Sequence, residues 1–441
     1  EEINSDVFNQ IGLALATKIS SKNSDSVIIC RDGRISSKEL ADSLVDALVK
    51  CGVRVIDIGE LPTPLMNFSL HKLRIKNGLM ITGSHNPKNY NGVKMVIDNL
   101  TIYGEHIQEL YNLIEKKEFV EKDKNGSCLK NTSIANNYIQ YVKENIDIEN
   151  NLKVVIDCGN GITGPLVNDI CESFGLDYKI INESVDGNFP SHPPDPTNPV
   201  NLQQIQKVLH EWGADLGIAF DGDGDRMILV KNDGEIIWPD QLMIIFSKRI
   251  LESQKGKIVF DIKCSKHLND SILKSGGEPI VSRTGHSFIK KSMTENNAIL
   301  GGEMSGHIFF NDIWHGFDDG HYSAVRLLDI MNETGSSLND LLDSLPVSYS
   351  TPELNIDVPE ESKFKIIEDF IENASIDGEK DFTDGLRASF ENGWALLRAS
   401  NTTPKLVLRF EADSQVSLEM IKKNFTEELK KFLPNEDINL E

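Results

Sequence analysis

A short polar turn and an acidic loop carry the residues of this chain that are best suited to chemistry. The turn Thr82-Gly-Ser-His-Asn-Pro87 presents one serine hydroxyl, Ser84, among residues that favour tight turns. The loop Asp221-Gly-Asp-Gly-Asp-Arg226 places three carboxylates at every second position, with an arginine directly after them. Carboxylates on a tight loop suit Mg²⁺, and a serine beside such an ion could carry a phosphoryl group.

Other interpretations of both segments stay open at this point. An EF-hand calcium loop also alternates aspartates, but it needs a glutamate at its twelfth position, where this chain has Asn232. It also needs flanking helices, whereas Leu216–Phe220 has the composition of a strand. A solvated acidic turn is the remaining alternative for the loop. An ordinary polar turn is the alternative for the segment that contains Ser84.

Two later segments offer groups that bind sugars and phosphates. Gly301-Gly-Glu-Met-Ser-Gly-His307 alternates a glutamate, a serine and a histidine, and the first two can hydrogen-bond vicinal sugar hydroxyls. Arg398-Ala-Ser-Asn-Thr-Thr-Pro404 combines an arginine fork with hydroxyl and amide groups, which suits a phosphate grip that also uses Arg409. Taken alone, His307 is also compatible with a core histidine, and the arginine segment with a solvated loop.

The functional loops follow equivalent strands of a unit that occurs three times. Each copy begins with a run of β-branched residues, continues through helix-like sequence and a second strand, and places its functional loop directly after a third strand. The opening strands are predicted at Val27–Asp32, Val154–Cys158 and Ile258–Lys263. Ligands of open α/β sheets gather at the carboxyl ends of parallel strands, so the three loops can face one cleft. Ser36 and Glu39 have capping-box spacing at the start of the first such helix.

Length and composition limit the class of protein. A chain of 441 residues is too long for one ordinary core and predicts three or four domains. Its composition is that of a soluble globular protein, and its net charge of −23 argues against nucleic acid or an anionic membrane surface as a partner. The six cysteines form no CxxC pair, so we expect a reducing compartment, with Cys30, Cys158 and Cys264 as small buried hydrophobes.

The four segments, in this order, resemble the α-D-phosphohexomutase superfamily, and within it most closely the bacterial phosphomannomutase/phosphoglucomutase family. The resemblance runs from Cys30-Arg-Asp-Gly-Arg34 to Leu408-Arg-Phe-Glu411, which is most of the chain. It implies an α/β fold of three tandem similar α/β domains with mixed sheets, plus a smaller C-terminal α+β domain, around a central cleft. The expected domains are a phosphoserine domain at 1–133, a metal-binding domain at 134–235, a sugar-recognition domain at 236–347 and a phosphate-binding domain at 348–441.

The same resemblance implies the activity and the site. It predicts an isomerase of the phosphotransferase class, which interconverts hexose 1-phosphate and 6-phosphate of mannose and glucose through a phosphoserine and a 1,6-bisphosphate. The implied cofactor is Mg²⁺, with hexose 1,6-bisphosphate as activator and small phosphosugars as partners. A cytoplasmic monomer that binds neither nucleic acid nor membrane is expected. The implied catalytic residues are Ser84, Lys94, Arg226 and His286. The implied metal ligands are Ser84, Asp221, Asp223 and Asp225. The implied substrate-binding residues are Lys263, Thr284, Glu303, Ser305, His307, Arg398, Ser400, Asn401, Thr402 and Arg409.

One element of the family pattern is not found. The resemblance implies a Tyr-Asp-Ile-Arg-Gly signature ahead of the first repeat, and no such segment occurs in this sequence, which opens at Glu1. A sequence that begins downstream of the signature and a protein that lacks it are both compatible with this start. The rival functions are a phosphoglucosamine mutase, a phosphatase that uses water as acceptor, and a non-catalytic phosphosugar-binding protein.

Overall fold

A computed structural model describes residues 3–149, 152–401 and 403–433. The chain forms two compact units. The first unit combines Glu1–Leu242 with Ser305–Leu341, and the second combines Met243–Met304 with Leu342–Glu441. Because the division falls inside the predicted 236–347 segment, the predicted domain boundaries stay a prediction.

The first sheet of the first unit has the strand order β5-β4-β3-β1-β2-β6. Strand β1 lies in the centre and pairs in parallel with β2 and β3, whereas β3 and β4 are antiparallel, so the sheet is mixed as expected. The strands are β1 (Ser26–Arg31), β2 (Arg54–Glu60), β3 (Gly78–Ile81), β4 (Val93–Ile97), β5 (Leu100–Thr101) and β6 (Ser127–Lys130). The turn that contains Ser84 therefore joins two neighbouring strands at the carboxyl end of β3.

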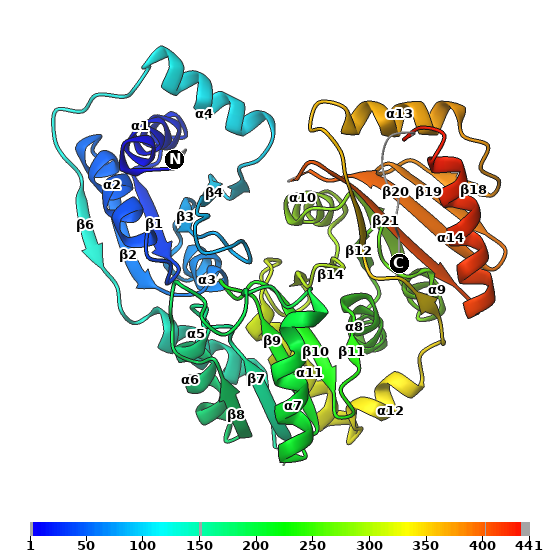
Figure 1. The fold of residues 1–441 in the computed structure, drawn as a ribbon. Helices are drawn as coiled ribbons and strands as arrows, with labels where there is room; N and C mark the ends of the chain where they lie inside the picture. Colours follow the sequence, from blue (N-terminus) through cyan, green and yellow to red (C-terminus); the bar gives the residue numbers. More distant parts are fainter. Residues whose placement is uncertain (1–2, 150–151, 402, 434–441) are drawn as a thin grey trace. The chain divides into compact units, whose positions relative to one another are not determined.

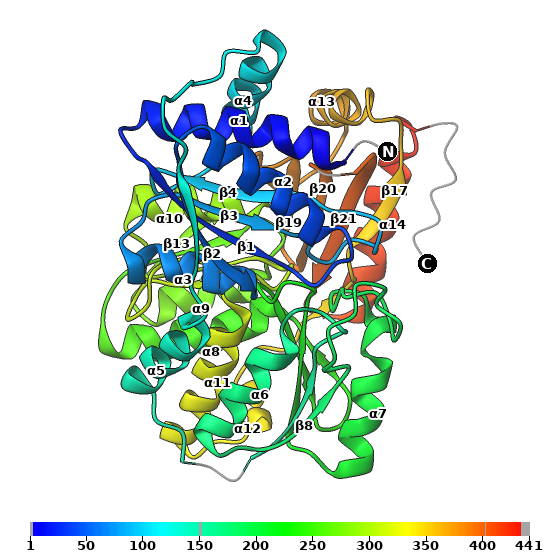
Figure 2. The ribbon, with the colours of Figure 1, turned by 90° about the vertical axis from the view of Figure 1, so that its left-hand side faces the viewer.

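Helices cover both faces of this sheet, as Figures 1 and 2 show for α1 and α2 on one side and α3 on the other. The helices are α1 (Ser5–Ser21), α2 (Ser37–Lys50), α3 (Thr63–Leu73) and α4 (Glu105–Lys116). Val27 and Ile29 of β1 pack with Leu15 and Leu44 from the first two helices. Each of these side chains is almost fully buried, which contributes about 1.5–3 kcal/mol per side chain to the free energy of unfolding.

The predicted capping box of α2 is wrong. Ser36 is the N-cap residue, but its backbone is helical (φ −79°, ψ −18°) and its side chain makes no capping hydrogen bond. The Ser36 hydroxyl instead accepts a hydrogen bond from Asn91 Nδ2 at 2.9 Å, and Glu39 accepts one from the hydroxyl of Ser5. A capping side chain needs an extended backbone at the N-cap, which this residue lacks.

The second sheet of the first unit has the order β11-β10-β9-β7-β8 and repeats the plan of the first. Its central strand β7 pairs in parallel with β8 and β9, and β9 is antiparallel to β10. The strands are β7 (Lys153–Asp157), β8 (Asp177–Ile181), β9 (Leu216–Phe220), β10 (Met227–Lys231) and β11 (Ile236–Ile237). The aspartate loop joins β9 to β10, as the turn with Ser84 joins β3 to β4.

The remaining elements that begin in the first unit are mostly helices. They are α5 (Ile134–Asn145), α6 (Gly164–Phe174), η1 (Pro199–Leu202), α7 (Gln203–Trp212), α8 (Pro239–Ser253), β15 (Ile308–Phe310), α11 (Gly320–Thr334) and α12 (Leu338–Asp343). Two of them, α8 and α12, run across the division between the units.

Strand β12 of the second unit pairs in parallel with β13 and β14, which is the arrangement of β1 with β2 and β3. The elements are β12 (Lys257–Asp261), α9 (Lys266–Lys274), β13 (Glu278–Ser282), α10 (His286–Asn296) and β14 (Leu300–Gly302). The opening strands of all three predicted modules are thus confirmed.

The C-terminal part of the second unit is a smaller α+β structure, as predicted. Its antiparallel sheet has the order β16-β21-β20-β19-β18, and β17 also pairs with β21. Phe370 of α13 and Phe425 of α14 pack on one face, against Leu397 and Leu408. Trp394 and Leu396 alternate with these residues and pack with Ile262 on the other face. The elements are β16 (Tyr349–Ser350), β17 (Leu354–Asp357), α13 (Lys363–Asn373), β18 (Glu379–Asp381), β19 (Leu386–Phe390), β20 (Gly393–Ala399), β21 (Lys405–Ala412) and α14 (Gln415–Leu429).

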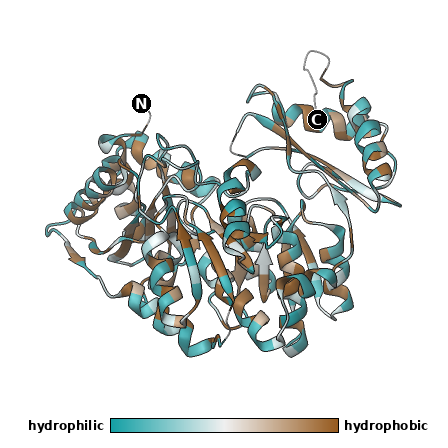
Figure 3. Cartoon of the chain, turned by 60° about the horizontal axis from the view of Figure 1, so that its bottom comes forward, coloured by the Kyte–Doolittle hydropathy of each residue, from teal (hydrophilic) through white to brown (hydrophobic). Residues whose placement is uncertain are grey.

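The distribution of polarity agrees with a globular protein. Figure 3 shows that the strands are mainly hydrophobic and that the helices have one hydrophilic side. The three cysteines that follow apolar runs, Cys30, Cys158 and Cys264, are buried as predicted. Burial raises the pKa of the first two thiols well above the usual range. Among the described residues, no helix is both long enough and apolar enough to cross a bilayer.

An aromatic cluster in the first unit contains a pair of stacked histidines. Trp314 stacks on Tyr322 with ring centroids 4.0 Å apart, and His315 stacks on His71 with centroids 4.4 Å apart. Burial, with a smaller effect of the His71 charge, lowers the pKa of His315 to about 4. Burial also lowers the pKa of His71.

We expect the stability of this unit to fall in acid through His315. Its pKa in the folded state lies below the ordinary value of 6.5, so the unfolded chain takes up the proton first. Stability from the neutral ring is complete above pH 6.5 and is lost as the pH falls towards 4. At about 1.4 kcal/mol per pH unit the loss is at most about 3.5 kcal/mol, and less because the ring is half-buried. We expect the free energy of unfolding, measured with urea, to fall less between pH 7 and pH 4.5 for His315→Gln than for the wild type. Equal losses would contradict this role of His315.

Candidate functional site

The loop after β3 holds Ser84 in a conformation that points its hydroxyl at the carboxylate of Asp221. Ser84 has φ +49°, in the left-handed region that non-glycine residues rarely adopt. Its N–H donates to Thr82 Oγ1 at 2.8 Å, and its Oγ donates to Asp221 Oδ2 at 2.9 Å. The residue is only 8% exposed. The turn thus aims one hydroxyl at the acidic loop.

Arg34 holds the carbonyl groups of this loop, a role that the sequence did not predict. Its guanidinium donates to the carbonyl oxygens of Ser84 (2.6 Å), Asn86 (2.7 Å), Pro87 (2.7 Å) and Tyr90 (3.1 Å). A side chain at Gly83 would lie 2.6 Å from the guanidinium carbon, so glycine is needed there. These contacts explain how a strained turn keeps one shape.

The acidic loop after β9 places its three carboxylates together in the interior. Asp221, Asp223 and Asp225 are all 0% exposed, and each offers an oxygen within 4.8 Å of the others. Lys94 of β4 forms ion pairs with Asp223 at 2.7 Å and with Asp225. Thr63, at the start of α3, donates its hydroxyl to Asp223 at 2.5 Å, a contact not anticipated from sequence.

The electrostatics of this cluster indicate an excess of negative charge. Burial, together with the neighbouring carboxylates Asp223 and Asp225, raises the pKa of Asp221 well above its usual range. Burial also opposes ionisation of Asp223, but the charge and hydrogen bond of Lys94, the hydrogen bond of Thr63 and the Arg226 charge together outweigh it and lower the pKa of that carboxyl. Burial disfavours the charged form of Lys94, yet Asp223, Asp225 and Asp221 raise the pKa of its ammonium. A further cation would relieve the repulsion at Asp221.

The three aspartates fit a divalent metal ion. Asp223 Oδ1 and Asp225 Oδ1 are buried and have no hydrogen-bond partner among the described residues. An ionised oxygen buried without a partner is costly, whereas an oxygen-only donor set is what Mg²⁺ prefers. The geometry therefore supports a metal site formed by these carboxylates, with Ser84 adjacent to it.

Arg226 and His307 border the same cluster. Arg226 Nε lies 3.7 Å from Asp221 Oδ2 and donates a hydrogen bond to His307 Nε2 at 2.9 Å. Its charge, followed by burial, lowers the pKa of His85, the residue after Ser84, to about 2. The structure thus brings Ser84, Lys94, Arg226 and the three aspartates together, and their catalytic and metal-binding roles stay a prediction.

Within the predicted sugar-loop residues, Ser305 and His307 belong to the first unit, whereas Glu303 belongs to the second. Glu303 is 2% exposed and accepts a hydrogen bond from the N–H of Gly285. Ser305 is half-buried. The sugar-contact roles of these three residues stay a prediction.

A second group of predicted residues gathers around Asp261, at the end of β12. Thr284 donates its hydroxyl to Asp261 at 3.3 Å, and Lys263 lies 3.6 Å from the same carboxylate. Lys263 also pairs with Glu353, which the sequence did not single out. Burial opposes the charge of Lys263, but Glu353 and Asp261 outweigh it and raise the pKa of the ammonium. His286 is half-buried and begins α10.

The predicted phosphate grip contains two buried arginines. Arg398 is 4% exposed and donates through Nε to Asp384 at 2.8 Å. Arg409 is 3% exposed and donates to the backbone carbonyl of Lys263. The Asn401 amide donates to the carbonyl of Thr284 at 3.3 Å. The hydroxyl of Ser400 accepts hydrogen bonds from Thr403, and Thr402 lies outside the described residues. Two residues of the phosphate grip, Asn401 and Arg409, therefore donate hydrogen bonds to two residues of the Asp261 group, Thr284 and Lys263, within the second unit.

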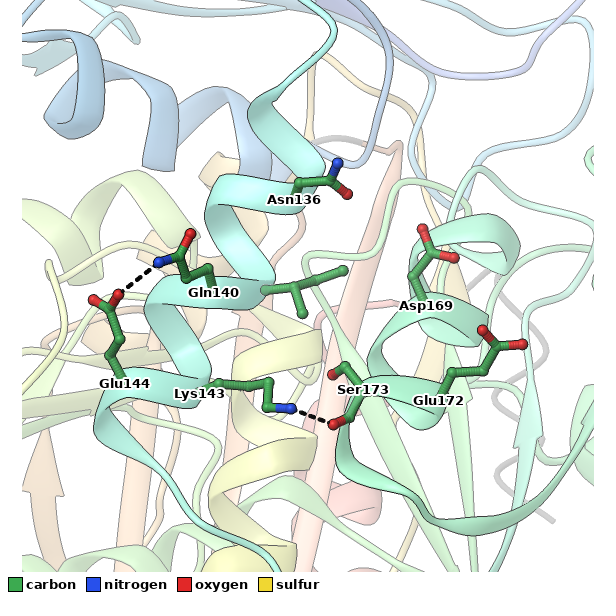
Figure 4. A pocket seen from close by; sticks show the side chains of 8 residues that line it. Asn136, Gln140, Lys143, Glu144, Asp169, Glu172 and Ser173 are labelled. Carbon is green, nitrogen blue, oxygen red and sulfur yellow. Dashed lines mark hydrogen bonds between the residues drawn. The ribbon is translucent and has the colours of Figure 1, made fainter.

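A groove between α5 and α6 is distinct from these sites (Figure 4). It has a volume of about 650 Å³ and is lined by none of the predicted site residues. Gln140 donates to Glu144 at 3.0 Å within α5, and Lys143 donates to the carbonyl of Ser173, as the dashed lines of the figure show. The groove carries both signs of charge and has no feature of a phosphate site.

Four protein-family models match successive parts of the chain. Three describe phosphoglucomutase/phosphomannomutase α/β/α domains I, II and III and match residues 1–121, 136–234 and 238–349. The fourth describes the C-terminal domain of phosphoglucomutase/phosphomannomutase and matches residues 353–428. Together these matches cover most of the chain and support the predicted fold class.

Relatives of this chain carry corresponding names. A Pseudomonas syringae protein named phosphomannomutase/phosphoglucomutase is 43% identical over 99% of this chain and 94% of its own length. A Neisseria gonorrhoeae protein named phosphoglucomutase is 42% identical over 94% of this chain and 91% of its own length. A crystal structure of a phosphoglucomutase/phosphomannomutase family protein from Burkholderia thailandensis has a TM-score of 0.93 and 39% identity, over 99% of this chain and 96% of the other.

Proposed function

The chain belongs to the phosphoglucomutase/phosphomannomutase family, and on that premise we propose that it interconverts the 1-phosphate and 6-phosphate forms of mannose and glucose. The observation that carries the proposal is the hydroxyl of Ser84, which lies 2.9 Å from Asp221 beside a buried acidic cluster. Such a hydroxyl can store a phosphoryl group, because its neighbours supply both a proton acceptor and positive charge.

In this proposal the phosphorylated Ser84 donates its group to the free hydroxyl of a bound hexose phosphate. The P–O bond to Ser84 and the O–H bond of the sugar hydroxyl break, and a P–O bond to the sugar forms. The released proton ends on Ser84 Oγ, and a hexose 1,6-bisphosphate results. The bisphosphate then turns within the site and returns its other phosphoryl group to Ser84. A bisphosphate that escapes can rephosphorylate the enzyme, which is why we propose hexose 1,6-bisphosphate as its activator.

Lys94 and Arg226 supply the fixed positive charges of the site. The Lys94 ammonium is held by two aspartates, and the Arg226 guanidinium is held by His307. Both can stabilise charge on the phosphoryl group as it leaves or reaches Ser84. Mg²⁺ bound by Asp221, Asp223 and Asp225 would supply further charge neutralisation at the phosphoryl group.

The residues of the second unit are proposed to bind the sugar and its non-reacting phosphate. Arg398 and Arg409 would bind the phosphate, with Ser400, Asn401 and Thr402 as neutral donors. Lys263, Thr284, Glu303 and His286 would contact the remaining substrate, together with Ser305 and His307 of the first unit. A monomer that acts on small phosphosugars in the cytoplasm remains our proposal for partners and location.

One assay distinguishes the proposal from its rivals. Mannose 1-phosphate, glucose 1-phosphate and glucosamine 6-phosphate are each supplied with Mg²⁺ and a trace of the matching bisphosphate, and both sugar products and free phosphate are measured. We expect conversion of the first two substrates to their 6-phosphates without release of phosphate. A preference for the glucosamine ester indicates a phosphoglucosamine mutase, free phosphate indicates a phosphatase, and no product indicates a binding protein.

Arg398 gives a test of the phosphate grip. Arg398 is proposed to contact the phosphate of the substrate and not its sugar. We therefore expect Arg398→Ala to raise KM by about 10-fold or more for mannose and glucose phosphates alike. Release of bisphosphate during turnover should also rise. Arg398→Lys is the matched control, because it keeps a cation beside the buried Asp384. A change in KM for one of the two sugar phosphates alone would show that Arg398 contacts the sugar.

A further inference from the structure

The hydroxyl of Thr82 lies between a buried ion pair and the backbone of Ser84. Thr82 Oγ1 donates a hydrogen bond to Asp32 Oδ2 at 2.8 Å and accepts one from the N–H of Ser84, also at 2.8 Å. The Asp32 carboxylate in turn pairs with Arg34 Nε at 3.1 Å. Thr82 is 5% exposed, and the two charged residues are each 3% exposed. Solvent therefore has little access to this chain of hydrogen bonds.

Donors and acceptors match at every step of the chain. The N–H of Ser84 can only donate, so Thr82 Oγ1 presents a lone pair to it. The hydroxyl proton of Thr82 then points at Asp32, whose carboxylate also accepts from the backbone N–H groups of Arg34 at 3.1 Å and Gly83 at 3.2 Å. Thr82 thus connects the position of the carboxylate to that of the Ser84 amide.

Arg34 holds the other side of the same serine. Its Nη2 donates to the carbonyl of Ser84 at 2.6 Å. The ion pair of Asp32 and Arg34 therefore reaches both backbone polar groups of Ser84, the N–H through Thr82 and the carbonyl directly. Serine rarely adopts a φ of +49°, and such a conformation persists only where its surroundings hold it.

The position of Asp32 is itself fixed by the first sheet. Asp32 directly follows β1, and its N–H donates to the carbonyl of Ile81, the last residue of β3, at 2.9 Å. A comparable contact occurs in the second unit, where Asp261 ends β12 and accepts from the N–H of Met304, in the loop after β14, at 3.4 Å. In both modules a carboxylate at the end of the central strand holds the loop that follows the neighbouring strand.

Small movements of the turn would separate Ser84 from its partner in the acidic loop. A side chain at Gly222 would lie 2.5 Å from the carbonyl oxygen of Ser84, so the two backbones are in close contact. Ser84 Oγ reaches Asp221 Oδ2 at 2.9 Å. A displacement of about 1 Å would break this hydrogen bond, and misplacement of a reacting group by that amount costs up to about 10²-fold in rate.

We propose that Thr82 is a positioning residue, which transmits the fixed position of the Asp32–Arg34 ion pair to the amide of Ser84 and so keeps Ser84 Oγ aimed at the acidic loop. The part that concerns phosphoryl transfer rests on the proposed function. Thr82 binds the backbone of Ser84 and not its hydroxyl, so its hydrogen bonds persist when Ser84 is phosphorylated. Loss of the Thr82 hydroxyl should slow the chemical step more than it weakens substrate binding.

Hydrogen exchange of the Ser84 amide tests the restraint independently of activity. Protein labelled with ¹⁵N-serine is transferred to D₂O and followed by NMR, and a Ser84→Ala sample identifies the Ser84 signal. We expect slow exchange in the wild type, with and without phosphate on Ser84. Exchange should be faster by about 10-fold or more in Thr82→Val, which has similar size and no hydroxyl, and within about 3-fold of the wild type in Thr82→Ser. A wild-type amide that exchanges as fast as an unstructured peptide would overturn the proposal whether or not Thr82→Val folds.

Kinetics with glucose 1-phosphate test the consequence. We expect Thr82→Val to lower kcat by about 10-fold or more while KM changes by less than about 3-fold, and Thr82→Ser to keep kcat within about 3-fold of the wild type. The matched control is Thr17→Val. The Thr17 hydroxyl also donates to a carbonyl, that of Leu13, and accepts from an N–H, that of Val120, both at 2.9 Å. Its loss should lower the melting temperature and leave kcat and the Ser84 exchange rate unchanged.

Each contrary result has a defined meaning. Unchanged kcat in folded Thr82→Val, or an equal loss of kcat in Thr17→Val, would show that Thr82 has no specific positioning role. Wild-type protein that does not interconvert hexose phosphates would refute the proposed function instead. The exchange rates would then still decide whether Thr82 restrains the Ser84 backbone.

Discussion

The Ser84→Ala variant should lose steady-state interconversion of hexose phosphates by at least about 10³-fold and remain folded. Ser84 Oγ is the group that donates to Asp221 at 2.9 Å, and no other hydroxyl of the turn is predicted to carry phosphate. Alanine accepts the same left-handed backbone at a cost similar to that of serine, and Arg34 still holds the loop. The loss should therefore come from the missing phosphoryl carrier.

Intact mass measurement separates this explanation from misfolding. Wild-type protein incubated with glucose 1,6-bisphosphate should gain the mass of one phosphoryl group, and Ser84→Ala should gain none. Ser69→Ala is the matched control, because Ser69 is buried in the same region and donates only to the backbone carbonyl of Leu65 at 2.7 Å among the hydrogen bonds described. Persistence of the mass shift in Ser84→Ala would place the phosphoryl group on another residue.

Neutralising Asp223 should weaken the metal site and slow phosphoryl transfer. Asp223→Asn removes one of three buried carboxylates and one partner of Lys94. We expect the affinity for Mg²⁺ to fall by about 10-fold or more and kcat to fall by about 10²-fold. Calorimetric titration with Mg²⁺ measures the first effect, and the mutase assay measures the second.

Asp157→Asn is the control for the loss of a buried aspartate. Asp157 ends β7, is 1% exposed and lies 3.0 Å from His192 Nε2, so its neutralisation should affect stability and leave Mg²⁺ affinity unchanged. Raised Mg²⁺ concentrations should partly restore the activity of Asp223→Asn, because the variant keeps two carboxylates. Full activity of the wild type after treatment with EDTA would show that no divalent ion is required.

The part of the site that could be predicted from sequence is the part carried by local patterns. Ser84 follows from turn residues, and Asp221, Asp223 and Asp225 follow from their alternating spacing. The opening strands were also predictable, because buried parallel strands are continuous runs of apolar residues. These features depend on neighbours in the sequence.

Residues that act through distant partners could not be predicted in this way. Arg34 and Ser84 are 50 positions apart, and Thr63 and Asp223 are 160 positions apart. The capping box at Ser36 failed because the backbone of Ser36 is helical, and Asn91, from another loop, donates to its hydroxyl.

The transfer of the phosphoryl group itself is the most direct test of the proposed function. Protein carrying ³²P on Ser84 is mixed with excess unlabelled glucose 1-phosphate in a single turnover, and protein, sugar phosphates and free phosphate are separated. We predict that the label leaves the protein, appears first in glucose 1,6-bisphosphate and then in glucose 6-phosphate, with none in free phosphate. Label that stays on the protein, or that appears as inorganic phosphate, would contradict a mutase that works through Ser84.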